Sequence, residues 1–484
     1  MPLFIPDSSL NPSETAMSKS ERPLLNHHAA MPDATSRRRF LQSASAGFGW
    51  LAFAGLSSAQ AADESNPLAP KAGHHPAKAK RVIFLCMRGG PSQMETFDYK
   101  PQLNADDGQP SKNTNQKYFG SQWAFRQYGE SGQWISDLMQ HTAAHADKLC
   151  VLNGMHTDSN EHGAALTQMH TGSFQFHRPS IGSWALYGLG SDNANLPGFI
   201  SIKPPVILGG ARNYSSAFLP TIYQGTPIGT MSQALSKAVV PNLSNSRLTT
   251  AAQRRQLDFL QAANRDIVAR QGHSPVEGLI ETYELAFRMQ SELPAAMDIS
   301  GETEATLDMY GIGPGKRTED FGRQCLLARR LAESGVRFIE LTHDNWDHHG
   351  GVAANMPLRC GQIDQPVAAL LTDLDQRGLL DDTLVLWGGE FGRTPDDPRG
   401  DGRGHNNNGF TMFAAGGGVK PGLRHGATDE YGYEAVEGRV HVHDLHATIL
   451  HLMGLDHERL TYRYAGRDFR LTDVYGEVVH EILA

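Results

Sequence analysis

Histidine and carboxylate residues gather in a few short runs of this sequence. The densest is Thr342-His343-Asp344-Asn345-Trp346-Asp347-His348-His349, and another begins at His156 and ends at His162. Imidazole together with carboxylate binds Zn, Mn or Fe well, whereas carboxylates with carbonyl or amide oxygens suit Ca or Mg. We therefore predict a divalent metal site that holds Zn, Mn or Ca. Its predicted ligands are Asp347, His349, Glu390, His405, Asp98 and His156.

A single histidine in such a run is more often a solvated loop residue or a hydrogen-bonded core residue than a ligand. Asp347 and His349, however, lie in a glycine-flanked loop directly after an apolar run. Glycine allows backbone and ligand to approach closely, and acidic and imidazole groups that gather in such a loop favour metal or catalytic use.

The catalytic candidates are His162, Ser92 and Arg393. The run Arg88-Gly89-Gly90-Pro91-Ser92 can cradle an anion through its backbone amides, with Arg88 or Arg393 as the charge partner. Ser92 or His162 is the candidate nucleophile or base. The run is neither a P-loop nor a dinucleotide fingerprint, because neither GxxxxGK[ST] nor GxGxxG follows this apolar segment, and a GxSxG elbow is absent.

Apolar runs typical of buried strands precede most of these candidates. They alternate with helical patterns, which predicts an α/β fold with a mostly parallel central sheet and helices on both faces. In such folds ligands bind at the carboxyl ends of the strands. The predicted strands are Val82 to Met87, Leu149 to Leu152, Val336 to Leu341, Leu384 to Trp387 and Phe410 to Ala414, and the helices include Gly163 to Met169, Glu319 to Ser334 and Pro357 to Arg377.

Three further segments complete the expected domain. Residues 99–132 are polar and rich in Gln, Asn and Gly, so we predict a long loop region. Long helical patterns predict a helical insertion around residues 230–300. The last predicted helix has Asp444 as its N-cap and Gly454 at its end.

The formal net charge of −9 excludes a broad basic face. Nucleic acids and anionic membranes are therefore not expected partners. None of the four cysteines has CxxC spacing, and Cys86 and Cys150 lie in apolar runs, which favours buried thiols over a disulfide.

The N-terminal region carries an export signal. Ser36-Arg37-Arg38-Arg39-Phe40-Leu41-Gln42 is followed by an apolar, small-residue segment that ends near Ala61. This pattern predicts export by the twin-arginine machinery into the periplasm or medium. The segment is too short and too rich in Gly and Ser for a stable membrane span. We therefore divide the chain into an extension and signal at 1–61, a linker at 62–80 and a domain at 81–484.

From Arg81 onward the sequence resembles the bacterial family 1501 of domains of unknown function, a relative of the alkaline-phosphatase-like and sulfatase superfamily. The resemblance is carried by Gly89-Gly90-Pro91-Ser92, Thr96 to Pro101, Trp346-Asp347-His348-His349, Gly389 to Pro395 and Asp444 to Leu450. It implies an alkaline-phosphatase-like fold and metal-dependent hydrolysis or transfer of phosphate or sulfate esters.

The sequence departs from sulfatases at two places. Thr171-Gly172 matches the end of their CxPSRxxLxTG motif, but the position of the modified cysteine falls on His162 and no CxPSR occurs, which excludes formylglycine chemistry. The paired aspartates that sulfatases place after the first strand align with Arg88 and Gly89.

These observations lead to two hypotheses. The first is an exported metal-dependent hydrolase of phosphate or sulfate esters, with a small-molecule or polysaccharide ester as its substrate. The second is a non-catalytic binding or scaffold protein of the envelope that keeps the sulfatase-like fold, with an envelope protein as its partner.

Overall fold

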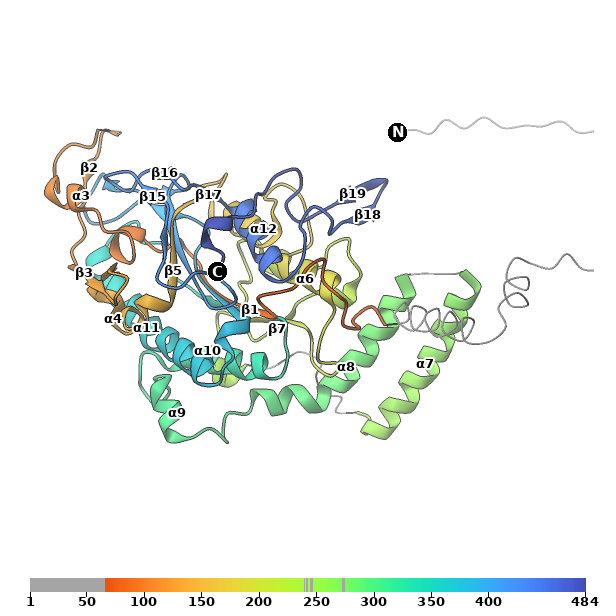
Figure 1. Cartoon of the computed structure of the whole chain (residues 1–484). Coiled ribbons are helices and arrows are strands. Elements are labelled where there is room, and N and C mark those ends of the chain that lie inside the picture. Colours follow the sequence, from red (N-terminus) through yellow and green to blue (C-terminus); the bar gives the residue numbers. More distant parts are fainter. Residues whose placement is uncertain (1–65, 113, 239, 241–242, 244–246, 272–274) are drawn as a thin grey trace, which may run out of the picture. The chain divides into compact units, whose positions relative to one another are not determined.

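The centre of the fold is a mixed sheet of nine strands in the part of the chain that the structure describes (Figure 1). This computed structural model describes residues 66–484 apart from 113, 239, 241–242, 244–246 and 272–274. The predicted N-terminal extension and export signal, residues 1–61, lie outside the described residues. The described residues all fall in one compact unit.

The sheet is mostly parallel, as the sequence predicted. Its strands, in spatial order, are β14 (Arg424–His425), β5 (Leu149–His156), β13 (Phe410–Ala415), β9 (Thr383–Gly388), β1 (Arg81–Met87), β8 (Phe338–His343), β6 (Phe199–Ile202) and β7 (Thr226–Ile228), with β17 (Val440–His441) also paired to β5. Every neighbouring pair is parallel except those of β13 with β5 and β9. β13 is reversed because the chain returns from β9 through a loop and not through a crossover helix.

Helices cover both faces of this sheet. Residues Val82 to Met87 of β1 are each 5% exposed or less, as expected for a central strand covered on both sides. Side chains of α5, α6 and α12 pack on one face against β1, β8, β9 and β13, while α10 and α11 lie on the other (Figure 1). These helices are α5 (His162–Thr171), α6 (Ile181–Leu189), α10 (Glu319–Glu333), α11 (Val352–Gln376) and α12 (Val442–Leu452).

The N-terminus of α12 differs from the prediction. His441 is the N-cap, because its side chain accepts a hydrogen bond from the backbone N–H of His443. Asp444 is the third residue of the helix, and its carboxylate accepts from the backbone N–H of His441 at 2.9 Å. The two residues form a capping box, so Asp444 stabilises this end from inside the helix.

The region of the predicted helical insertion contains a pair of long helices, α7 (Thr250–Gln271) and α8 (Pro275–Met297). An ion pair of 2.8 Å between Arg254 and Glu284 joins them. No helix among the described residues is long and apolar enough to cross a membrane.

The remaining segments contain only short elements. The predicted loop at 99–132 includes α3 (Pro101–Ala105), β2 (Lys117–Tyr118) and β3 (Phe125–Tyr128). Residues 66–80 of the predicted linker are held by backbone hydrogen bonds from Lys71 to Leu189 and from Lys78 to Leu452. The other short elements are α4 (Gln140–Ala143), α9 (Glu304–Met309), β4 (Gln133–Ser136), β10 (Gly392–Arg393), β11 (Asp396–Asp397), β12 (His405–Asn406), β15 (Ala427–Thr428), β16 (Ala435–Glu437), β18 (Tyr462–Tyr464) and β19 (Arg467–Phe469).

A charged pair is buried between α5 and the sheet. His170 Nε2 lies 3.1 Å from Glu340 Oε1, and the two side chains are 2% and 1% exposed. Burial opposes a charge on His170, but Glu340 and Cys86 outweigh it and hold the pKa of His170 well above its usual range. All four cysteines fall within the described residues and are buried free thiols.

This pair makes stability depend on pH. Because the pKa of folded His170 is raised, its contribution is complete below about pH 6.5 and is lost as the pH rises through the folded pKa. We expect Glu340→Gln to lower the free energy of unfolding at pH 6 by about 3–5 kcal/mol, since it leaves a buried imidazole without its counter-charge. Urea unfolding at pH 6 and pH 9 measures both effects.

The variant should also show a smaller decrease in stability between the two pH values than the wild type does. Glu430→Gln, at an exposed position, is the matched control and should leave both values unchanged. An identical pH dependence in the wild type and Glu340→Gln would contradict the assignment.

Candidate metal centre

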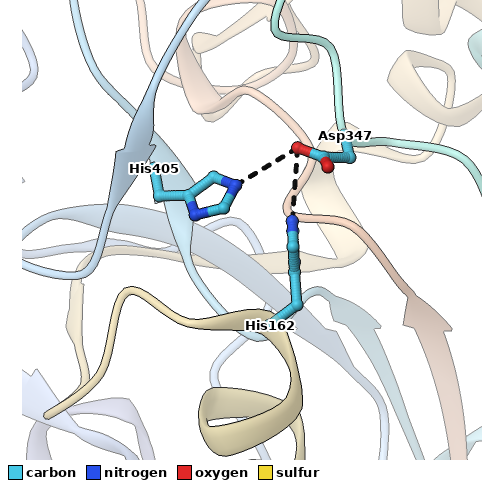
Figure 2. Close-up of side chains that lie close together, drawn as sticks. All are labelled: His162, Asp347 and His405. Carbon is cyan, nitrogen blue, oxygen red and sulfur yellow. Dashed lines mark hydrogen bonds and ion pairs between the residues drawn. The ribbon is translucent and has the colours of Figure 1, made fainter. Parts of the chain in front are cut away.

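Three side chains from distant parts of the sequence meet beyond the carboxyl ends of the central strands. His162 is the first residue of α5, which follows β5, and Asp347 lies in the loop after β8. His405 is in β12, in the loop between β9 and β13. Figure 2 shows both imidazole rings pointing toward one oxygen of the Asp347 carboxylate. The side-chain donor atoms of these three residues lie within 4.8 Å of one another.

One oxygen of Asp347 is the centre of the cluster. Asp347 Oδ1 lies 3.2 Å from Nε2 of His162, 3.2 Å from Nε2 of His405 and 3.0 Å from Nε2 of His349. The Nε2 atoms of His349 and His405 are 2.9 Å apart. The structure thus brings together the predicted ligands Asp347, His349 and His405 and adds His162, which the sequence placed among the catalytic candidates.

The other nitrogen of two of these rings is already engaged. His405 Nδ1 is 2.7 Å from the backbone carbonyl oxygen of Asn160, which only accepts hydrogen bonds. His162 Nδ1 is 2.6 Å from Glu390 Oε1. In their neutral forms both rings therefore carry their proton on Nδ1 and direct an Nε2 lone pair toward Asp347.

Glu390 occupies a different place from the one predicted. Its side chain is fully buried, and besides His162 it accepts a hydrogen bond of 3.0 Å from the backbone N–H of Gly89. It stands behind the His162 ring and does not share the cluster at Asp347. A carboxylate that holds the far nitrogen of a histidine orients the ring and raises its basicity as a ligand.

Burial and neighbouring charges shift the pKa values of the residues in this cluster. Burial alone would lower the pKa of His162, but contacts with Asp347 and Glu390 raise it to about 9. Burial would raise the pKa of Asp347, yet His162, His405 and Arg393 hold it well below its usual range. Burial lowers the pKa of His349, with Asp347 acting in the opposite direction. The Asp347 carboxylate is therefore ionised at neutral pH.

The residues at this centre fit a divalent metal ion. Nε2 of His162 is buried and has no hydrogen-bond partner among the described residues, although it lies 3.2 Å from Asp347 Oδ1. Ligand bonds of about 2.0–2.1 Å in a tetrahedral zinc site place neighbouring donor atoms about 3.3 Å apart. The three distances to Asp347 Oδ1 and the His349–His405 distance, 2.9 to 3.2 Å, are close to that spacing, and the donor atoms of His162, Asp347 and His405 all lie within 4.8 Å of one another.

The buried guanidinium of Arg393 holds the Asp347 carboxylate in place. This guanidinium is 1% exposed and donates to Asp347 Oδ1 at 2.7 Å and to the carbonyl oxygen of Gly90 at 2.8 Å. It also donates to the carbonyl oxygens of Gly89 and Arg403. Because this side chain is buried and bonded to protein groups, it does not present the anion-binding surface that the sequence suggested.

The turn after β1 approaches this loop closely. Gly89 has a φ of 111°, and a Cβ atom at that position would lie 2.8 Å from the backbone nitrogen of Asp347. Only glycine combines that backbone conformation with so close a contact. Glycine at position 89 is therefore required for this close packing. The backbone N–H of Gly89, which we predicted to bind an anionic ligand, instead donates a hydrogen bond to the Glu390 carboxylate.

Three predicted site residues lie outside the cluster. Ser92 is 4% exposed and its hydroxyl has no hydrogen-bond partner among the described residues. Asp98 is buried against Lys100, 3.1 Å away, and accepts a hydrogen bond from the Thr428 hydroxyl, so Lys100 neutralises its charge locally. His156, at the end of β5, packs against the ring of His441 at 5.1 Å, and burial lowers its pKa.

A buried ion pair that sequence reasoning missed positions the loop that carries His405. Arg403 and Glu95 are 1% and 0% exposed, and their side chains meet at 2.5 Å and 3.0 Å in a two-point contact. Arg403 also donates to the carbonyl oxygen of Phe119 at 2.8 Å. No local pattern signals this pair, since its members are more than three hundred residues apart.

Several solved structures are weakly similar to this chain. A lipoteichoic acid synthase from Listeria monocytogenes has 9% identity and a TM-score of 0.37, with 87% of this chain and 81% of that chain covered. A PsFucS1 sulfatase from Pseudoalteromonas sp. has 12% identity and a TM-score of 0.36, with 84% and 72% covered. A phosphonate monoester hydrolase from Silicibacter pomeroyi has 11% identity and a TM-score of 0.32, with 78% and 73% covered. Likenesses this weak support no particular activity.

Comparison with protein families gives a clear match. No curated protein matches the chain. The model of the family described as "Protein of unknown function (DUF1501)" matches residues 79–483, which is almost the whole of the described chain. This agrees with the resemblance drawn from the glycine turn and from the Trp346 to His349 run. The chain therefore belongs to the DUF1501 family.

Proposed function

We propose that this chain is a metal-dependent hydrolase of phosphate or sulfate esters that works without formylglycine. The observation that carries the proposal is the convergence of three imidazole Nε2 atoms on one oxygen of Asp347. His162, Asp347, His349 and His405 would hold the ion. Three nitrogen donors and one carboxylate oxygen suit Zn or Mn better than Ca, which prefers oxygen ligands.

The chain's own residues prepare this centre. Glu390 keeps the His162 ring in place, Asn160 does so for His405, and Arg393 holds the Asp347 carboxylate. A divalent ion held there would supply positive charge that stabilises the oxygens of the ester and acidifies a water molecule. His349 is the most exposed member, with 49% of its side chain open to solvent, so substrate reaches the centre on its side. Water is the nucleophile in this proposal, because Ser92 is buried.

The substrate and location extend the proposal beyond the site. The substrate is a small-molecule or polysaccharide ester, and the enzyme acts in the periplasm or medium after twin-arginine export. The export signal at Ser36 to Gln42 supports that location.

The alternative is a metal-holding binding or scaffold protein of the envelope with an envelope protein as its partner. One observation favours it: both predicted anion-binding arginines are engaged within the protein. Arg88 is paired with Asp344, and Arg393 is buried against Asp347 and backbone carbonyls.

The metal can be tested directly. We expect about one divalent ion for each wild-type chain, and we expect Asp347→Ala and His405→Ala to lose it, since each removes a donor atom. Elemental analysis of the exported protein, after incubation with Zn, Mn or Ca, measures the content, and circular dichroism confirms that each variant is folded.

His141→Ala is the matched control for a histidine, because His141 is exposed and lies away from the cluster. A folded wild type that holds no ion after all three incubations would overturn the proposal. Ion content with no hydrolysis of phosphate or sulfate esters would favour the binding protein.

The role of Glu390 gives a second test. We expect Glu390→Gln to keep the fold but to weaken metal binding about 10- to 100-fold, because the neutral amide no longer holds Nδ1–H of His162 with a charge. Competition with a chelator of known affinity measures the change. Glu161→Gln is the control, since Glu161 is exposed and directly precedes His162. Equal affinity in the wild type and Glu390→Gln would refute the orienting role.

A further inference from the structure

A hollow lies beside the loop that connects β5 to α5. Its volume is about 930 Å³, and it is lined by the end of α5, the start of α12 and the loop at 473–477. The connecting loop separates it from the metal centre. Asn160 in that loop holds His405, whereas Asp158 lines the hollow and lies 3.3 Å from His441. This volume is typical of a small-molecule binding site.

Large apolar side chains are exposed at the rim of this hollow. Tyr475 is 61% exposed, Phe176 is 58% exposed and Val474 is 69% exposed. The Tyr475 ring stacks on His443, with 5.1 Å between ring centroids and 4° between planes, and Arg178 lies over the Phe176 ring at 5.3 Å. Each aromatic ring therefore packs against a protein group on one side, while much of its surface is exposed to solvent. Exposed apolar surface of this kind often marks a binding site.

The loop that presents Tyr475 is held rigidly. Asp473 has a φ of 50°, in the left-handed region. Arg467 donates to its carboxylate, and Arg470 donates to its backbone carbonyl oxygen. Tyr475 N–H donates to the carbonyl oxygen of Thr472 at 2.9 Å. Backbone strain that surrounding bonds maintain is found at ligand sites, and a fixed aromatic ring loses little entropy on binding.

The charge of the lining selects among ligands. Five carboxylates line the hollow, from Asp158, Asp444, Glu458, Asp473 and Glu477, against the guanidinium of Arg470, while Arg467 pairs with Asp473 and Arg178 lies over the Phe176 ring at the rim. Arg470 is itself paired with Glu458 at 3.0 Å. Burial lowers the pKa of His441, although Asp158 opposes this, so His441 adds no positive charge at neutral pH. Carboxylates therefore outnumber guanidinium groups at this hollow, which disfavours sulfated or phosphorylated groups.

We propose that this hollow binds a sugar unit that carries no anionic substituent. The apolar face of the sugar ring packs on Tyr475 and Phe176, and its hydroxyl groups donate to the carboxylates of Asp158 and Glu477. A sugar ring is apolar on its faces and polar at its edge, so it needs both an aromatic surface and hydrogen-bond acceptors. This binding does not depend on the metal centre, so it holds whether the protein is a hydrolase or a binding protein.

Calorimetric titration of the full-length exported protein tests the proposal. The probes are cellohexaose, xylohexaose and chitohexaose, which are uncharged, and a chondroitin sulfate hexasaccharide, which is anionic. We expect at least one uncharged probe to bind and the sulfated probe not to bind. Tyr475→Ala and Phe176→Ala should each weaken binding about tenfold through the loss of a stacking contact.

Two controls separate this site from the rest of the molecule. Tyr283→Ala removes an exposed tyrosine of α8, away from the hollow, and should bind as the wild type does. Asp347→Ala should also bind normally, which distinguishes failure of this proposal from failure of the metal centre. The proposal is overturned if no uncharged probe binds, if only the sulfated probe binds, or if both aromatic variants, shown to be folded, bind as tightly as the wild type.

Discussion

The carboxylate of Asp347 is the point on which the candidate centre depends. A single oxygen faces three imidazole nitrogens and a buried guanidinium. Arg393 supplies one positive charge from inside the protein, but the lone pairs of neutral His162 and His405 would repel the carboxylate across about 3 Å. Protons or a cation must therefore lie among these atoms. A divalent ion at this position would resolve the conflict for all four side chains at once.

The surrounding structure keeps these atoms in place through buried polar contacts. Arg393 bonds both to Asp347 and to the turn after β1, and Glu390 bonds both to that turn and to His162. The Arg403–Glu95 ion pair holds the loop that carries His405. Each contact joins segments that are far apart in sequence. Groups this deeply buried are costly to leave unpaired, so the contacts specify one arrangement of the loops.

Much of the arrangement of this centre could be predicted from the sequence. The contacts that could not be predicted depend on residues that meet only in the folded chain. Asp347, His349 and His405 follow apolar strands, so their convergence at one edge of the sheet follows from the α/β pattern. Asp98 follows a strand too, but Lys100 neutralises it, which only the folded chain reveals. The burial of Arg393 depends on carbonyl oxygens, which have no sequence signature. Glu390 was identified as part of the site, but its position behind His162 depends on a partner 228 residues away.

The wide separation of the ligands along the chain has a consequence for the order of events in biosynthesis. His162, Asp347 and His405 meet only where the strands that precede them have joined one sheet, and β13, which lies between β5 and β9 in that sheet, follows β5, β8 and β9 in the sequence. A nascent or partly folded chain offers no complete set of donors, so an ion bound at this centre would have to be acquired after folding. A protein exported in its folded state would receive its ion before translocation, from the metal pool of the compartment in which it was synthesised.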